Sequence, residues 1–348
     1  MRAVCVYLIV VFHIELWVVE TTGLSAVGDT NRWWDLAHGL LDRVRLGGLL
    51  LLSGMLVSRR LLTDGRRRLD ATSIRRAVSS YYLYVVWLAV YWLVFTVAVA
   101  VRPSTASYPH AFTSVSDAVS QLVNPMTSLW YLFALACYVG LMLVVVRLRV
   151  PAPVVIAAAC VLSVVAHGWD QWAANRIGFH LVFFVLGVYL GQSATTMSRM
   201  SARWIMPTVL AFGLVTVAGV AGDLTSSTYA LVARLGSIPV ILVASVFLAR
   251  LAPVARLGAF VGRRTLSVYV LHPLLLIPLW WWATEQPGQA STVAANPLGL
   301  ALLLYGGGAV ITSMALLVEH GLRKIRAGAL FAMPAAVLPP REPAASAR

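Results

Sequence analysis

Charged residues are scarce in this sequence. They make up 11% of the 348 residues, whereas a typical soluble domain carries about 25%. Hydrophobic residues make up 60%, and the mean hydropathy is +0.82. A soluble globular domain is therefore excluded. We expect an all-α, polytopic integral membrane protein, embedded in a lipid bilayer and built as a helix bundle.

Cysteine and the common enzyme motifs are also scarce. The three cysteines, Cys5, Cys137 and Cys160, lie in apolar runs, and their spacing fits neither a disulfide framework nor a metal site. There is no glycine-rich phosphate loop, no Gly-x-Ser-x-Gly elbow and no His-Glu-x-x-His motif. These absences argue against an ATPase, a serine hydrolase of that type and a zinc protease. We expect no metal cofactor.

Ten apolar runs are long enough to be candidate membrane spans. They cover approximately residues 3–20, 36–58, 77–101, 128–146, 152–167, 178–193, 204–220, 228–249, 265–283 and 297–318. Basic residues alternate between successive loops, with seven arginines between the second and third runs and one in the next loop. The positive-inside rule then predicts that both termini are cytoplasmic. The net charge of +14 is read as a topology signal that also attracts anionic lipids, and no nucleic acid partner is expected.

The first span carries an arginine and a histidine at a regular helical spacing. Eleven positions separate Arg2 from His13, which places them on one helix face about 16 Å apart. Glu20 follows seven residues later on about the same face. A histidine deep in a membrane helix is costly and indicates function by default. The alternatives are that Arg2 only sets topology and that His13 only bonds a neighbouring helix.

A polar stripe marks the second span. Asp35, His38, Asp42 and Arg45 follow one another at steps of three, four and three, and so share one helix face. Such a stripe must face the bundle interior or a water-filled cavity. A purely structural charge network is the alternative. Trp130 opens the fourth span, where a place in the interfacial aromatic belt is the simpler interpretation.

Several stretches, taken together and in order, resemble one known family. The spacing from Arg2 to His13 is similar to the signature of the membrane acyltransferase 3 family. So are the segments Arg45-Leu-Gly-Gly-Leu-Leu-Leu-Leu-Ser-Gly54, Arg75-Arg76-Ala-Val-Ser-Ser-Tyr-Tyr82, Ser128-Leu-Trp130-Tyr-Leu, Phe183-Phe-Val-Leu-Gly187 and Leu266-Ser-Val-Tyr-Val-Leu-His272-Pro. The sequence diverges at Gly47, where the family has proline. The chain resembles a divergent, stand-alone member.

The resemblance implies an O-acyltransferase of the bacterial cytoplasmic membrane. Such an enzyme moves an acyl group, commonly acetyl, from cytoplasmic acyl-CoA to a hydroxyl of an envelope glycan or glycolipid. Residues 1–326 would form the transmembrane acyltransferase domain, and residues 327–348 a disordered cytoplasmic tail. Because no hydrolase-like domain is fused to the spans, the chain is expected to transfer the group directly or to pass it to a separate extracytoplasmic transferase partner.

The polar residues would then have the following roles, as a hypothesis. Arg2, Arg75 and Arg76 would bind the phosphates of acyl-CoA, and neutral His13 would act as general base. Arg45 would either hold a carboxylate of the stripe or stabilise the thioester oxyanion. A transient acyl-histidine is a further route. The remaining residues are assigned to acceptor binding: Glu20, Asp35, His38, Asp42 and Trp130.

Two functions of other classes stay open at this point. A non-catalytic transporter or flippase for a lipid-linked sugar would use the same buried charges for binding alone. A structural subunit of an envelope complex would use them for assembly. Replacing His13 by alanine separates the three, because only an enzyme would lose acyl transfer while keeping its fold.

Overall fold

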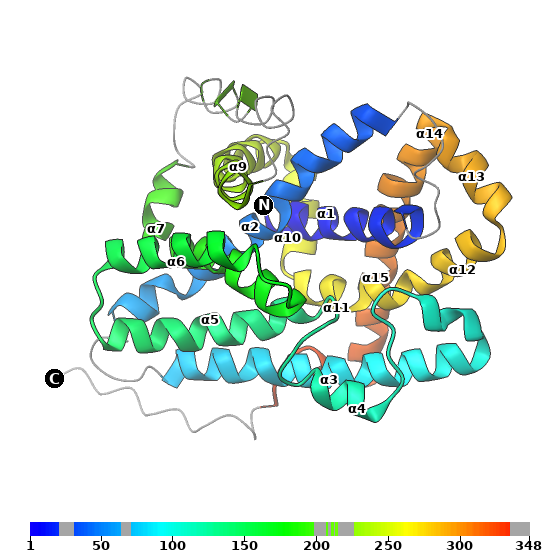
Figure 1. Cartoon of the computed structure of the whole chain (residues 1–348), viewed down its shortest axis with the longest axis horizontal. Coiled ribbons are helices and arrows are strands. Elements are labelled where there is room, and N and C mark those ends of the chain that lie inside the picture. Colours follow the sequence, from blue (N-terminus) through cyan, green and yellow to red (C-terminus); the bar gives the residue numbers. More distant parts are fainter. Residues whose placement is uncertain are drawn as a thin grey trace.

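The computed structural model describes residues 1–20, 31–63, 71–197, 207, 210–211, 213–214 and 226–334. All regular structure in these ranges is helical (Figure 1). The α-helices are α1 (Arg2–Ile14), α2 (Asn31–Thr63), α3 (Ala71–Val101), α4 (Val115–Ser120), α5 (Trp130–Arg147), α6 (Ala152–Ala166), α7 (Trp172–Met197), α9 (Ser227–Leu248), α10 (Ala252–Gly262), α11 (Thr265–Leu275), α12 (Ile277–Glu285), α13 (Pro287–Ala295), α14 (Pro297–Ala301) and α15 (Gly307–Lys324). The π-helical turns are η1 (Glu15–Glu20) and η5 (Leu302–Gly306), and the 3₁₀ turns are η3 (Pro103–Ser107) and η6 (Gly328–Leu330).

Seven helices in the described ranges are long and apolar enough to cross a membrane, so the chain is a multi-pass membrane protein. They are Arg2–Glu20, Ser73–Val101, Trp130–Arg147, Trp172–Gly191, Ser227–Leu248, Thr265–Glu285 and Pro297–Lys324. Each coincides with one of the ten predicted spans. The expected all-α membrane fold is therefore confirmed, while the count of ten and the cytoplasmic placement of both termini stay predictions.

The other three predicted spans are not among these seven helices, each for a separate reason. The second lies in α2, an unbroken helix of 33 residues whose charges keep its hydropathy low. The fifth is α6, which has only 15 residues. The seventh, 204–220, falls almost wholly outside the described residues. The structure also shows a short helix, α10, in a stretch that the sequence reading treated as a basic loop.

Helix α1 lies at the centre of the bundle and contacts α2, α10, α11 and α15 (Figure 1). Its apolar face, which includes Val6, Ile9 and Val10, is buried. The π turn η1 continues α1 beyond Ile14. A second π turn, η5, packs against α1. Tyr7 of α1 donates a 2.7 Å hydrogen bond to the Tyr305 carbonyl in η5. That bond ties α1 to the irregular segment η5.

Helices α2 and α7 approach each other closely at glycines. A Cβ atom on Gly54 would overlap the Phe184 carbonyl oxygen, and one on Gly187 would overlap the Leu51 carbonyl oxygen. The backbones can meet there only because both residues lack side chains. This close contact also fixes where Arg45, nine residues before Gly54, lies along the bundle relative to the start of α7.

The packed structure extends beyond Arg326. The indole of Trp87 on α3 donates a 2.7 Å hydrogen bond to the Leu330 carbonyl, and the Phe331 ring packs on Trp87. The first residues of the predicted tail are thus held against α3. The rest of that tail, 335–348, lies outside the described residues.

Candidate active site

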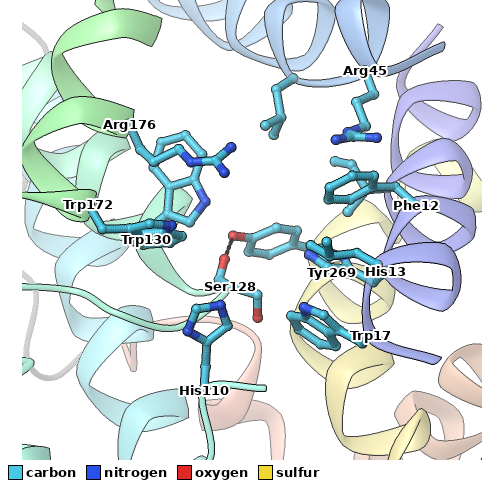
Figure 2. Close-up of a pocket in the computed structure, with 13 residues that line it drawn as sticks. Phe12, His13, Trp17, Arg45, His110, Ser128, Trp130, Trp172, Arg176 and Tyr269 are labelled. Carbon is cyan, nitrogen blue, oxygen red and sulfur yellow. Dashed lines mark hydrogen bonds between the residues drawn. The ribbon is translucent and has the colours of Figure 1, made fainter. Parts of the chain in front are cut away.

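A small cavity lined by both aromatic and polar side chains lies inside the bundle beside the end of α1. Its volume is about 80 Å³. Its walls come from α1, η1, α2, the segment between α3 and α5, α5 itself, α7 and α11. Figure 2 shows His13, Trp17 and Tyr269 on one side and Trp130, Trp172 and Arg176 on the other. The further lining residues are Ile9, Phe12, Leu16, Arg45, Leu46, His110 and Ser128.

His13 is held by aromatic and imidazole rings around its own. The Trp17 ring centroid lies 4.2 Å from that of His13 and the Phe12 centroid 5.3 Å. Trp17 belongs to the π turn, which widens the helix to bonds five residues apart and so changes which side chains share a face. The His13 ring is partly exposed to the cavity, while Trp17 is buried.

A second histidine contacts His13 from α11. The His272 Nε2 atom lies 2.8 Å from His13 Nδ1, although 259 positions separate the two residues. The His272 Nδ1 atom lies 3.1 Å from the Val268 carbonyl oxygen, one turn earlier in α11. His272 is completely buried, with an exposed fraction of 0%. The two imidazoles therefore form a chain that begins in the interior of α11 and ends at the cavity.

Arg45 lies against the aromatic face of α1. Its guanidinium carbon sits 3.2 Å from the centroid of the Phe12 ring, and its exposed fraction is 3%. A guanidinium over an aromatic face is attracted by the ring quadrupole, and more strongly where water is excluded. Arg45 also lies within electrostatic range of His13. Arg45, the arginine of the polar stripe on α2, thus lines the cavity.

The segment between α3 and α5 folds back onto the bundle and reaches the cavity. Tyr108 is buried there and donates a 2.6 Å hydrogen bond to the Pro273 carbonyl. Two residues later, His110 adopts a left-handed backbone with φ of 61°, a conformation that is uncommon for residues other than glycine. Its ring lies between Trp17 and Trp172, with centroids 6.1 Å and 5.4 Å away. Burial, and then the positive charge of Arg176, lower the pKa of His110 below the usual histidine value.

Tyrosines and serines line the interior between the cavity and the other end of α1. Tyr269 donates to the Ser128 carbonyl (Figure 2). The Tyr131 hydroxyl lies 2.7 Å from Ser53 Oγ, and Ser53 in turn donates to the Leu49 carbonyl. The Tyr131 and Tyr269 ring centroids are 5.3 Å apart. A series of buried hydroxyls therefore runs from the cavity toward α2 and α5.

Three of the predicted arginines lie at the start of α1 and α3. Arg2 and Arg76 are both within electrostatic range of the Tyr131 hydroxyl. The Arg2 Cβ atom packs close to Gly262, at the end of α10. The Nε atom of Arg75 is buried and has no hydrogen-bond partner among the described residues. The helices thus bring Arg2 and Arg76, far apart in sequence, near one hydroxyl.

The other predicted site residues have different outcomes. Trp130 lines the cavity and is 6% exposed, so it lies inside the bundle and not in an aromatic belt at its surface. Glu20 is exposed at the end of η1 and does not line the cavity. The π turn is the physical reason, because it shifts residues after Ile14 away from the α-helical register that the spacing assumed. The backbones of Asp35, His38 and Asp42 belong to α2, but their side chains lie outside the described residues.

The sequence alone assigns no role to three residues that line the cavity or contact His13, namely His110, Arg176 and His272. No periodicity connects them, since they come from α11, the α3–α5 segment and α7. Over the described ranges, no group of three histidine, cysteine or acidic side chains is arranged to hold a metal ion.

The comparisons with known proteins give one match. Neither the curated proteins nor the solved structures include a significant match to the chain. A family model described as an acyltransferase domain, that of the acyltransferase 3 family, matches residues 1–318. The match covers α1 through most of α15 and includes all residues that line the cavity. The chain therefore belongs to the acyltransferase 3 family, whose members are membrane acyltransferases.

Proposed function

We propose that this protein is a membrane O-acyltransferase that uses acyl-CoA, most simply acetyl-CoA, to acylate a hydroxyl of an envelope glycan or glycolipid. The observation that carries the proposal is the placement of His13. Its ring is supported on one side by aromatic and imidazole groups and on the other faces a cavity that aromatic and polar side chains line. A partly buried histidine that faces a cavity suits a general base.

The donor would enter from the end of the bundle where α1 begins. Arg2 and Arg76 both lie within electrostatic range of Tyr131, and Arg75 precedes Arg76 in α3. Guanidinium groups are suited to binding phosphates through paired hydrogen bonds. The buried Arg75 Nε without a partner among the described residues supports an anion at this position. Tyr131 contacts both Ser53 and Tyr269, and Tyr269 lines the cavity. The hydroxyls of Tyr131 and Ser53 would line the route of the pantetheine arm toward His13.

The acceptor would approach from the opposite side of the cavity. Trp130 and Trp172 line the cavity across from His13, Trp17 lines it beside His13, and the His110 ring lies between Trp17 and Trp172. Aromatic faces and hydrogen-bonding side chains together suit the apolar faces and hydroxyls of a sugar ring. The bilayer then separates the two substrates, and the protein would let them meet at His13. This arrangement corresponds to a protein of the bacterial cytoplasmic membrane, with the donor in the cytoplasm and the acceptor in the envelope.

The proposed reaction proceeds as follows. His13 accepts the proton of the acceptor hydroxyl while the hydroxyl oxygen forms a bond to the thioester carbonyl carbon. The negative charge that develops on the carbonyl oxygen is stabilised by Arg45, the cation close to His13. The carbon–sulfur bond then breaks, and the leaving thiolate of CoA takes the proton from His13. The products are an acyl ester of the glycan and free CoA.

Release of free thiol from acetyl-CoA tests the proposal. Purified protein in detergent is supplied with acetyl-CoA and envelope extract, and wild type is compared with His13→Ala. We expect thiol release that requires the extract and that falls by roughly 10²- to 10⁴-fold in His13→Ala. A transporter for a lipid-linked sugar would release no CoA. Equal release by both proteins would refute the role of His13.

A further inference from the structure

The contact between the two histidines has a direction that hydrogen-bonding chemistry determines. A backbone carbonyl can only accept, so the 3.1 Å contact between His272 Nδ1 and the Val268 carbonyl requires a proton on Nδ1. A neutral imidazole carries one N–H. The Nε2 atom of His272 is then an acceptor. The 2.8 Å contact with His13 therefore requires the proton on His13 Nδ1.

This direction leaves one atom of His13 free for chemistry. With Nδ1 protonated, the lone pair of neutral His13 is on Nε2, the ring atom that His272 does not contact. His13 is also the partly exposed member of the pair, and it lines the cavity, whereas His272 is completely buried. A base must present its lone pair to the proton that it takes. The geometry therefore selects the productive tautomer.

We propose that His272 is a positioning residue that fixes the Nδ1-protonated tautomer of His13 and directs His13 Nε2 into the cavity. This proposal rests on the proposed function for its kinetic consequences, but the hydrogen-bond direction itself does not. His272 fills the place that a carboxylate holds in a serine hydrolase triad. Unlike a carboxylate it is neutral, so it orients His13 without placing a negative charge inside the membrane.

The proposal also accounts for the way α11 supports the pair. Proline has no backbone N–H, so Pro273 cannot donate to the Tyr269 carbonyl in the way that an ordinary helical residue would. Tyr269 and Val268 both offer carbonyl oxygens to the His272 ring. The Tyr108 hydroxyl bonds the Pro273 carbonyl from the α3–α5 segment. Contacts therefore hold α11 in place both just before His272, at Val268 and Tyr269, and just after it, at Pro273.

Two variants of His272 separate positioning from packing. In His272→Gln, the side-chain amide oxygen can reach the place of the imidazole Nε2 and accept from His13. In His272→Leu, a similar apolar volume offers no acceptor. We expect His272→Leu to lower kcat by roughly 10²-fold with little change in the KM for acetyl-CoA. His272→Gln should recover most of this loss. His167→Gln, at a histidine that does not line the cavity, is the control for replacing an imidazole.

The tautomer can be observed without any substrate. ¹⁵N NMR of histidine-labelled protein distinguishes protonated from unprotonated ring nitrogens, and His13→Ala and His272→Gln assign the two rings among the seven histidines. We expect protonated Nδ1 and unprotonated Nε2 on His13. A proton on His13 Nε2 would overturn the proposal. So would wild-type kcat in a folded His272→Leu. Full activity of His13→Ala would instead refute the proposed function, while the NMR result would still decide the hydrogen-bond direction.

Discussion

The contact between Arg45 and Phe12 gives a prediction whose size follows from burial. The Arg45 guanidinium lies 3.2 Å from the Phe12 ring centroid, and Arg45 is 3% exposed. A desolvated cation–π contact is worth about 2 kcal/mol, compared with about 0.5–1 kcal/mol at an exposed site. Each 1.4 kcal/mol corresponds to a factor of ten. If Phe12 holds Arg45 over the cavity, its loss should cost up to roughly 30-fold in kcat/KM.

The experiment replaces Phe12 by leucine and by tyrosine. Leucine keeps an apolar side chain but has no ring quadrupole, whereas tyrosine keeps the aromatic face. We expect kcat/KM for acetyl transfer to envelope extract to fall up to roughly 30-fold in Phe12→Leu and to stay close to wild type in Phe12→Tyr. The matched control is Phe260→Leu, because Arg264 lies 4.1 Å from the centroid of that exposed ring, away from the cavity. Wild-type activity in Phe12→Leu would refute the reasoning.

Three further predictions concern stability. Gly187→Leu should lower the free energy of unfolding in detergent by about 1–3 kcal/mol or more, and with it the melting temperature, because a side chain there meets the Leu51 backbone. Gly140→Leu is the control and should leave the melting temperature unchanged, because a Cβ atom there meets nothing within 4 Å. Folding lowers the pKa of His110, so as the pH falls this imidazole is protonated in the unfolded chain before it is protonated in the folded protein. The free energy of unfolding should therefore fall as the pH drops below about 6.5. His110→Gln should show a shallower fall when melting is followed from pH 7.5 to 5, and an unchanged slope would contradict this. Arg102→Gln should change stability by less than about 1 kcal/mol and leave activity intact, because its bond to Glu285 is solvent-exposed.

Much of the helical architecture could be predicted because the bilayer imposes it. Long apolar runs must form helices to satisfy their backbone groups, and all seven described helices that are long and apolar enough to cross a membrane follow such runs. Local spacing also worked within straight helices. The steps of α2 placed Arg45 on a face that the structure buries.

In the site, the sequence predicted only features that depend on spacing within one helix. The prediction for Glu20 assumed an α-helix throughout the first span, and the π turn after Ile14 breaks that register. His272 pairs with His13 across 259 positions, a contact that tertiary packing alone creates. His110 reaches the cavity because Tyr108 docks its segment against Pro273, which composition does not indicate.

Transfer of label from acetyl-CoA to the glycan tests the central proposal most directly. Protein in proteoliposomes is supplied with acetyl-labelled acetyl-CoA and envelope extract, and alkali-labile label in the glycan is measured for wild type and for His13→Ala. Our account predicts ester-linked label with the wild type and at least roughly 10²-fold less with His13→Ala. Equal labelling by the two proteins would contradict the proposal that His13 is the base.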